Sequence, residues 1–310
     1  MDDVQPTLEP LSGGWSGETF LAGVGAERTV VRVYGGRSLA RGPAAPEVDA
    51  AVLALVRGLL PVPDVLEVRR ADPVSGSPGL LVTSFVPGVR GDLALDGIRE
   101  DDEALARLGR GLGRVAGLLA CMPQPSTGPF LDGDLRIGSY GDQVDVGGVL
   151  AARRDDLHLA DGWGPSELDG LEELAGCADE VLSDVRRRSL VHSDLNPKNV
   201  LVDPTSLEIA AVLDWEFAHA GHPATDLGNL LRHDRRPAYV EGVVAAYRER
   251  VPAAEGRRDL LDRARAADLV ALLDLAARPG ADMPLDPEAG RARALLLAVA
   301  RARDWHAQPD

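Results

Sequence analysis

The sequence predicts an α+β fold of two lobes, in which a small β-rich lobe precedes a larger and mostly helical lobe. Up to Gly88 the chain consists mainly of short apolar runs separated by glycine-rich turns, a pattern typical of strands. Beyond Gly88, most apolar residues recur at helical spacing. The change falls within the segment SFVPGV, so we expect an N-terminal lobe at residues 1–88 and a C-terminal lobe at residues 89–310.

The N-terminal lobe is predicted to contain five strands and one helix. The strands correspond to the segments LEPL, TFLAGV, RTVVRVY, PVPDVLEVRR and GLLVTSFVPG. The helix corresponds to PEVDAAVLALVRGLL, which follows the third strand. Four of its apolar residues share one face at helical spacing, namely Val48, Val52, Leu55 and Leu59.

The C-terminal lobe is predicted to be helical on either side of a short β-rich block. Helices are predicted for EDDEALARLGRGLGRVAGLLACM and SELDGLEELAGCADEVLSDVRRR, and the acidic start of the first complements its dipole. The β-rich block runs from SLVHSD to VLDWE, and the chain from about Asp226 onward returns to helical spacing. Residues 123–165 are rich in Gly, Pro and Asp and give no clear pattern.

The overall composition excludes several classes of protein. The net charge of −16 disfavours binding to nucleic acid through a basic face. No apolar run is long enough for a membrane span, and the acidic segment MDDVQPTLEP does not resemble a secretory signal. The two cysteines, Cys121 and Cys177, are too few for a disulfide scaffold. We therefore expect a cytoplasmic protein that binds neither nucleic acid nor membranes.

The most informative segment is LVHSDLNPKNVLVD, which is followed by VLDWE. It places His192, Asp194 and Asn199 in the spacing H-x-D-x-x-x-x-N, and Asp214 follows Asn199 by fifteen residues. Phosphoryl transfer requires metal ions that bridge the phosphates and a carboxylate that orients the acceptor hydroxyl and accepts its proton. A loop aspartate can serve as that carboxylate, and the oxygens of Asn199 and Asp214 suit Mg²⁺. The pattern therefore predicts a phosphoryl-transfer site.

Together with the downstream segment HPATDLGNLL, these motifs resemble those of antibiotic phosphotransferases of the aminoglycoside type, which are distant relatives of protein kinases. The resemblance implies a bilobal protein-kinase-like fold with Asp194 as the catalytic base and with Asn199 and Asp214 as magnesium ligands. It also implies that His192 buttresses the catalytic loop. Asp226 is expected to be structural, either capping a helix or holding that loop.

Two further residues of this region allow more than one interpretation. Lys198 lies between the predicted base and a metal ligand, where it could reach a γ-phosphate oxygen or remain an exposed loop cation. It is the only lysine among 33 Lys and Arg residues, which makes it a candidate catalytic residue. Glu216 could contact a second metal ion or be an exposed loop acid.

The N-terminal lobe is predicted to bind the nucleotide, which is ATP or GTP. The segment SGGWSGE lies between two predicted strands, where the backbone N–H groups of a loop containing Gly14, Ser16 and Gly17 could cover phosphates. The phosphotransferase family normally carries a lysine on the third strand, and the segment VVRVY places Arg32 at that position. Arginine retains the positive charge and offers a fork of donors suited to phosphate.

The family lysine normally pairs with a helix glutamate, and the predicted helix offers two candidate partners for Arg32. Asp49 occupies the usual partner position, and Glu47 is its rival. Residues two apart on a helix point to different faces, so only one of them is expected to pair with Arg32. The segment LLVTSFVPG resembles the hinge that receives the purine, and its backbone at Ser84 and Val86 could offer a carbonyl and an amide to the adenine edge.

The acceptor is less well defined, because a fold does not determine a substrate. A small molecule with a hydroxyl group is expected, and a cationic antibiotic such as an aminoglycoside or a basic peptide would suit the acidic chain. The acids that could bind its ammonium groups are Asp132, Asp134, Asp155, Asp156, Asp268, Asp274 and Glu288. A neutral or arginine-lined site would instead favour a sugar, homoserine or a choline-like metabolite. A catalytically silent nucleotide-binding relative is the remaining alternative, because the strand lysine is missing.

Overall fold

The computed structural model describes residues 7–11, 18–24, 27–72, 74–158, 162–251, 260–278 and 287–309. The chain forms two compact units, each assembled from three segments of sequence. The first unit comprises residues 1–108, 130–138 and 197–218, and the second comprises residues 109–129, 139–196 and 219–310. The predicted boundary after Gly88 lies inside the first unit. The assignment of nucleotide binding and catalysis to the two predicted lobes stays a prediction.

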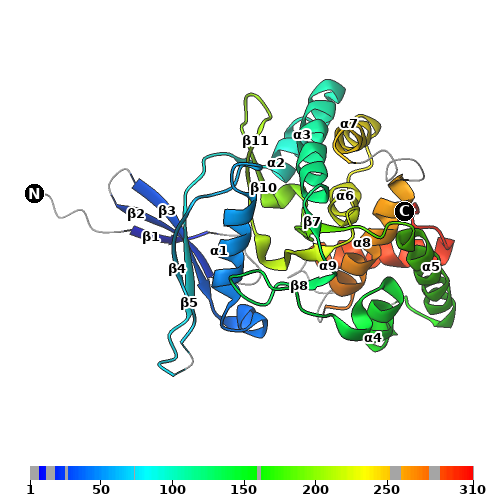
Figure 1. Cartoon of the computed structure of the whole chain (residues 1–310). Coiled ribbons are helices and arrows are strands. Elements are labelled where there is room, and N and C mark those ends of the chain that lie inside the picture. Colours follow the sequence, from blue (N-terminus) through cyan, green and yellow to red (C-terminus); the bar gives the residue numbers. More distant parts are fainter. Residues whose placement is uncertain are drawn as a thin grey trace, which may run out of the picture. The chain divides into compact units, whose positions relative to one another are not determined.

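The first unit is built on an antiparallel sheet of five strands in the order β1-β2-β3-β5-β4 (Figure 1). The strands are β1 (Thr7–Pro10), β2 (Glu18–Val24), β3 (Glu27–Tyr34), β4 (Val65–Arg69) and β5 (Gly79–Ser84). They correspond to the five strands predicted from the sequence. Arg32 of β3 lies opposite Thr19 of β2 and Leu81 of β5, so its backbone is paired on both sides.

One helix packs against this sheet, and it is shorter than the sequence predicts. The elements after β3 are the 3₁₀ helix η1 (Gly36–Arg41) and α1 (Ala45–Val56), which contacts β4 and β5. Val48 and Val52 are buried as predicted, but Leu55 is 41% exposed. Leu59 lies beyond the helix, because Gly58 adopts a left-handed conformation (φ 85°) that ends it.

Two strands of the first unit, β10 (Val200–Val202) and β11 (Ile209–Val212), lie between Asn199 and Asp214 in the sequence. With β6 (Val89–Arg90) they form a second sheet in the order β11-β10-β6. Strands β10 and β11 form an antiparallel pair between these two residues. The remaining elements of the unit are α2 (Gly91–Gly97), the start of α3 (Asp102–Ala120), η3 (Pro197–Asn199) and η4 (Trp215–Phe217).

The second unit is mostly helical and contains a four-stranded antiparallel sheet in the order β7-β9-β12-β8. Its strands are β7 (Pro123–Gln124), β8 (Gly128–Pro129), β9 (Arg188–Val191) and β12 (His219–Gly221). Its helical elements besides α3 are η2 (Gly141–Gln143), α4 (Val146–His158), α5 (Pro165–Ser183), α6 (Thr225–Leu231), α7 (Pro237–Arg248), α8 (Leu260–Ala276) and α9 (Pro287–Ala302). Among the described helices, none has the length and apolar character needed to cross a membrane.

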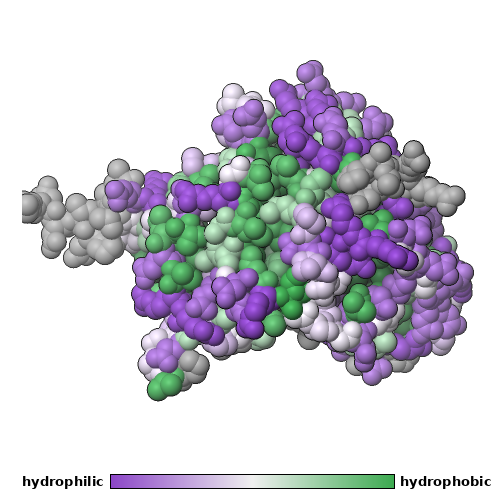
Figure 2. Space-filling model, in the orientation of Figure 1, coloured by the Kyte–Doolittle hydropathy of each residue, from purple (hydrophilic) through white to green (hydrophobic). Residues whose placement is uncertain are grey.

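Helices α4, α5, α8 and α9 enclose an apolar core. Leu157, Ala178, Leu273 and Leu296, one from each helix, are fully buried in it. The sequence does not predict α4, because two glycines at its start and a mixed run of charged residues obscure the helical spacing. Hydrophilic residues predominate on the outer surface of α3 and α5, as the high charge content leads one to expect (Figure 2).

Helix α3 approaches α7 closely at two glycines. A Cβ atom added to Gly109 would collide with the carbonyl oxygen of Tyr239, and one added to Gly113 would overlap that of Val243. Glycine weakens the interior of an isolated helix. Gly109 and Gly113 of the segment RLGRGLGRV are therefore required by packing between the two helices.

Candidate active site

The loop that follows β9 carries the predicted base, and one buried carboxylate holds it. Asp226, in the first turn of α6, accepts hydrogen bonds from the backbone N–H groups of His192 at 3.0 Å and Ser193 at 2.9 Å. Ser193 has a φ of 66°, a conformation that residues other than glycine adopt at an energetic cost. The two bonds to Asp226 offset that cost. The expectation that Asp226 holds the loop with the predicted base is confirmed.

Burial dominates the electrostatics of Asp226, which is 1% exposed. Burial raises the pKa of its carboxyl group, and the neighbouring His192 together with the two backbone N–H groups counteracts this rise in part. A buried carboxyl group without such donors would be strongly unfavourable. The position of Asp226 and the shape of the loop therefore stabilise each other.

The side chain of Asp194 is oriented by its neighbours in the same loop. Asn196 Nδ2 donates to Asp194 Oδ1 at 2.7 Å, and Asn196 is itself buried. The backbone N–H of Asp194 donates to Nδ1 of His192 at 3.3 Å, so this ring nitrogen acts as an acceptor. His192 is completely buried and contributes to the shape of the loop. Asn196 lies inside the motif, but its spacing to Asp194 gives no signal of this role.

The other half of the motif belongs to the first unit. Asn199 is buried, and its carbonyl oxygen accepts from the N–H of Leu213 at 2.8 Å. This bond ties η3 to the end of β11 directly before Asp214, which has left-handed dihedral angles (φ 62°, ψ 62°). Lys198 precedes Asn199 on η3 and is partly buried. The structure thus places Asn199 and Asp214 on neighbouring backbone segments.

Arg32 forms ion pairs with two carboxylates of the segment after β11. Its Nη1 donates to Asp214 Oδ1 and its Nη2 to Glu216 Oε2, each at 2.6 Å. Burial alone would lower the pKa of Arg32, but the two carboxylates outweigh burial and the pKa is raised. The side chain of Glu216 is 4% exposed, so its interpretation as an exposed loop acid is wrong. Arg32 therefore holds a fixed positive charge beside the predicted metal ligand.

The carboxylate of Asp49 is bound by Arg41 and Tyr34. Arg41 donates through Nη1 and Nη2 to the two carboxylate oxygens at 3.0 and 2.5 Å, and the Tyr34 hydroxyl donates at 2.6 Å. The guanidinium of Arg32 lies over the ring of Tyr34, 5.4 Å from its centroid. Burial, followed by the charge of Asp49, raises the pKa of Tyr34, so its hydroxyl stays protonated.

These contacts correct the predicted pairing of the strand cation with the helix acid. The rival acid, Glu47, pairs with Arg70 at 3.7 Å on the surface. The guanidinium of Arg32 carries two terminal donors in a fixed fork, and these reach the two acids after β11. The ion pair that the helix acid makes is with Arg41 of η1.

The predicted hinge and phosphate loop are defined only in part. The backbone N–H of Ser84 donates to the carbonyl oxygen of Asp64 at 2.8 Å, and the Ser84 hydroxyl accepts from the Asp64 N–H at 2.9 Å. An amide for a purine edge would therefore come from Val86, which stays a prediction. Three residues of the predicted phosphate loop lie outside the described residues, namely Gly14, Ser16 and Gly17.

Three of the acids predicted to bind a cationic acceptor are paired with arginines. The pairs are Asp132 with Arg136, Asp268 with Arg232 and Asp274 with Arg153. Asp268 is 2% exposed and is committed to its arginine. Asp134, Asp155 and Asp156 are exposed. Three of the seven acids predicted to bind ammonium groups are thus already engaged by arginines.

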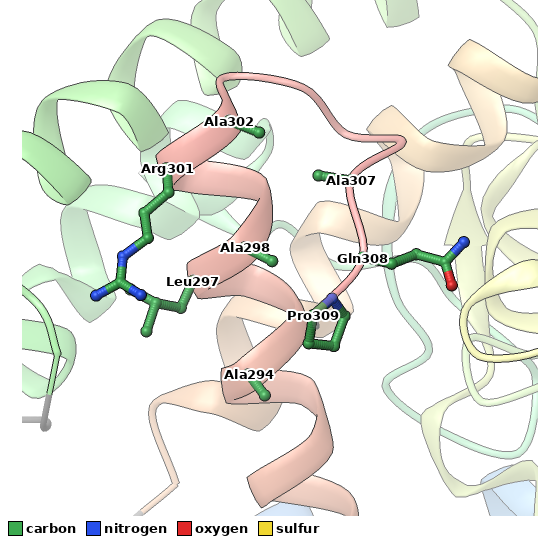
Figure 3. A pocket seen from close by; sticks show the side chains of 8 residues that line it. All are labelled: Ala294, Leu297, Ala298, Arg301, Ala302, Ala307, Gln308 and Pro309. Carbon is green, nitrogen blue, oxygen red and sulfur yellow. The ribbon is translucent and has the colours of Figure 1, made fainter.

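A groove of about 530 Å³ between α9 and the C-terminal segment contains none of the predicted site residues. Alanines of α9, Leu297 and Pro309 line it, and Gln308 projects from the C-terminal segment (Figure 3). Arg301 also lines it and donates to Glu167 at 3.3 Å. None of the lining side chains is a carboxylate or a hydroxyl, so the groove offers no base for phosphoryl transfer.

A match between the sequence and a family profile decides the family of this chain. The profile of the phosphotransferase enzyme family, APH, matches residues 7–266, which is most of the chain. The chain belongs to this family. It is therefore a phosphotransferase. The expected kinase-like α+β fold is confirmed.

Solved structures similar to this phosphotransferase support the same fold. A thermostable mutant of an aminoglycoside phosphotransferase, in a ternary complex with ADP and hygromycin B, is 24% identical with a TM-score of 0.66, over 96% of this chain and 94% of that chain. A microcompartment-associated aminopropanol kinase is 22% identical with a TM-score of 0.65, over 97% and 95%. A macrolide 2′-phosphotransferase from Brachybacterium faecium is 21% identical with a TM-score of 0.54, over 95% and 91%.

Curated relatives match only a short part of the phosphotransferase. Acyl-CoA dehydrogenase family member 11 of Gallus gallus is 35% identical over 63 residues, which is 20% of this chain and 8% of that protein. Its counterpart in Mus musculus is 46% identical over 41 residues, which is 13% of this chain and 5% of that protein. The matched part thus spans less than a tenth of the length of these relatives.

Proposed function

We propose that this phosphotransferase moves the γ-phosphoryl group of ATP or GTP onto a hydroxyl group of a small molecule, with Asp194 as the base. The observation that carries the proposal is the catalytic loop, in which Asp226 binds the backbone of His192 and Ser193 and Asn196 binds the Asp194 carboxylate. Asp194 orients the acceptor hydroxyl and takes its proton as the new oxygen–phosphorus bond forms, and the nucleoside diphosphate leaves.

Asn199 and Asp214 are the residues that we propose to hold Mg²⁺. An amide oxygen and a carboxylate are hard donors, and Mg²⁺ is commonly bound by one or two protein groups together with substrate phosphates. The bond between Leu213 and Asn199 supports this fit, because it keeps the two ligands on adjacent backbone segments. One oxygen of Asp214 accepts from Arg32, and a carboxylate has a second oxygen. The ion, when bound, neutralises charge on the phosphates.

The nucleotide is proposed to contact Arg32, the loop containing Gly14, Ser16 and Gly17, and the backbone at Ser84 and Val86. The fixed charge of Arg32 supports its role, and Lys198 is a second candidate for a γ-phosphate oxygen. ATP as the co-substrate has the support of similar structures that contain ADP or AMP-PNP. Because the reaction consumes a nucleoside triphosphate, we place it in the cytoplasm.

The acceptor's charge separates the candidate substrates. A cationic antibiotic, and with it a role in resistance, has the support of the net charge of −16 and of the aminoglycoside phosphotransferase complex with hygromycin B. A small metabolite has the support of the aminopropanol kinase and of the arginine partners of Asp132, Asp268 and Asp274. A catalytically silent nucleotide-binding protein has only the arginine at position 32 in its favour.

The experiment that tests the proposal measures nucleotide consumption with Mg²⁺ against a panel of aminoglycosides, basic peptides, neutral metabolites and hydroxy acids. Asp194→Asn is expected to lower turnover by about 10²–10⁴-fold, because the acceptor loses its proton acceptor, while nucleotide affinity is retained. The matched control is Asp72→Asn, which alters an exposed turn aspartate and should leave turnover unchanged. Turnover of D194N at the wild-type rate would show that Asp194 is not the base.

Binding measurements complete the test. Asp214→Asn is expected to weaken nucleotide binding that depends on Mg²⁺, whereas D194N should bind nucleotide as the wild type does. Thermal shift with Mg²⁺ and nucleotide measures both. If nucleotide binds but no acceptor of the panel is consumed, the silent relative is favoured over the kinase.

A further inference from the structure

Helix α6 joins the catalytic loop to a group of arginines. Asp226 near its N-terminal end holds the loop, and Leu231 and Arg232 form its C-terminal end. The helix has seven residues, so at 1.5 Å per residue its ends lie about 10 Å apart. A small acceptor whose hydroxyl group lies at Asp194 is therefore long enough to reach the C-terminal end of α6 with another group.

One acid of this region is saturated by its neighbours. Arg232 donates through Nε and Nη2 to the Asp268 carboxylate at 3.0 and 2.7 Å. Asn229 Nδ2 also donates to Asp268, at 3.0 Å. Arg232 and Asp268 are 2% exposed each, so this is a closed internal ion pair. Its charges cancel, and Asp268 is committed to Arg232.

Two more arginines lie beside this pair, Arg235 and Arg265, and neither forms an ion pair with a carboxylate among the described residues. Asp268 attracts both of them at longer range, and Asp304 also attracts Arg235. Arg265 of α8 donates through Nη1 to the carbonyl oxygen of Leu231, and Arg235 donates through Nη1 to that of His306 at 3.5 Å. The Nε atoms of both arginines are buried and have no acceptor in the described parts of the chain. Arg265 is only 6% exposed, so a full positive charge is buried there.

The electrostatics agree with this geometry. The pKa of Arg265 is lowered to about 10, first by burial and then by repulsion from Arg235 and Arg232, while Asp268 offsets part of the effect. Burial likewise lowers the pKa of Arg235. The charge of Asp194 is among the influences that raise the pKa of Arg232, the neighbour of these two arginines.

Capping of a helix explains only part of this arrangement. A cation at the C-terminal end of a helix interacts favourably with the helix dipole, and the bond from Arg265 to Leu231 is of this kind. It accounts for one guanidinium group. It does not account for Arg235 beside it, or for two buried Nε donors without acceptors. An oxyanion held by terminal nitrogens of the two guanidinium groups would neutralise these neighbouring cations, because the guanidinium fork suits carboxylate and phosphate.

We propose that Arg235 and Arg265, at the C-terminal end of α6, form a binding site for a carboxylate or phosphate group. The site deepens the proposed function, on which its connection to the acceptor rests. The acceptor then carries an anionic group that these arginines hold while its hydroxyl reaches Asp194. The alternative is that the site binds a separate anion, such as free phosphate, and not a group of the acceptor.

A thermal-shift titration tests the site itself. A few millimolar inorganic phosphate, compared with chloride at equal ionic strength, is expected to raise the Tm of the full-length protein. The titration is carried out with and without saturating ADP, so that binding at the nucleotide site is separated. Arg265→Met and Arg235→Gln should lose most of the response. Arg153→Gln, which alters an exposed arginine paired with Asp274, is the matched control and should keep it.

Two results would overturn the site: no response of the wild type, or an equal response of all four proteins. Because R265M alters a buried residue, circular dichroism checks its fold. R235Q alters a partly exposed residue and carries the test if R265M does not fold.

A kinetic measurement then distinguishes the acceptor from a free anion. For hydroxy acids or phosphorylated alcohols, R235Q is expected to raise the KM for the acceptor by about 10–100-fold, with the KM for nucleotide unchanged. Phosphate should compete with the acceptor. Binding of phosphate without competition would retain the anion site and refute its role in acceptor binding. If no acceptor is consumed at all, the proposed function fails, and the thermal-shift titration still decides the anion site.

Discussion

Replacing Arg32 with methionine tests the ion-pair network of the first unit, because methionine keeps an unbranched apolar stem and lacks the guanidinium. Nη1 and Nη2 of Arg32 lie 2.6 Å from oxygens of Asp214 and Glu216. Removal of one partner from a buried ion pair costs about 3–5 kcal/mol, because the other charge stays buried. Glu216 is 4% exposed and fits this case, whereas Asp214 is 29% exposed and is partly solvated. We expect R32M to lower the free energy of unfolding by about 3 kcal/mol.

A double-mutant cycle separates the charge pair from packing. Glu216→Gln removes the buried negative charge, so it should recover about 1–2 kcal/mol in the R32M background. Urea unfolding of the four proteins, with equal m-values, gives the coupling free energy. The control is Arg90→Met, which removes an exposed ion pair with Asp92 and should cost less than about 1 kcal/mol. A coupling between Arg32 and Glu216 below about 0.5 kcal/mol would refute the reasoning from burial.

Two further predictions concern stability. Burial is the first cause that lowers the pKa of His222, to about 3, so below pH 6.5 the unfolded chain takes up a proton that the folded chain does not. Stability should therefore fall from pH 7 to pH 5, and His222→Gln should reduce this loss by about 2 kcal/mol in urea unfolding; an unchanged loss would contradict it. Gly113→Ala should cost about 1–3 kcal/mol or more, since its Cβ would overlap Val243. The control is Gly176→Ala on α5, where an added Cβ meets no neighbour, and it should instead stabilise the protein by about 0.5–1 kcal/mol. Calorimetry compares the two variants, and equal changes in stability would contradict the packing argument.

The sequence predicts best those parts of the protein that depend on local spacing. The five strands, most helices and the loop containing Asp194 follow from apolar periodicity and from one motif. Helix α4 escapes prediction because its paired glycines and charged residues give no periodicity, and tertiary contacts with α5 and α8 form it. The motif resemblance includes the segment of Asp226 and therefore predicts two possible roles for it, of which the structure shows the anchoring of the loop.

The partners of charged groups are harder to predict, because they depend on contacts between distant parts of the sequence. Arg32 pairs with acids more than 180 positions away in the sequence, and Arg265 of α8 bonds to Leu231 at the end of α6. Spacing indicated which residue types gather in the motif, but it did not indicate which acid each arginine takes. The acids expected to bind a cationic acceptor illustrate the same point, since Asp268 is closed off by Arg232.

An arginine at position 32 changes the pairing of the whole network. Lysine has one ammonium group, whereas the two terminal nitrogens of Arg32 bind Asp214 and Glu216 separately. The helix acid then requires another cation, and Arg41 from η1 supplies it. The ring of Tyr34 lies beneath the guanidinium of Arg32 while its hydroxyl donates to Asp49. Arg32 and Asp49 are thus linked through Tyr34. A substitution at either residue is therefore expected to alter the contacts of the other.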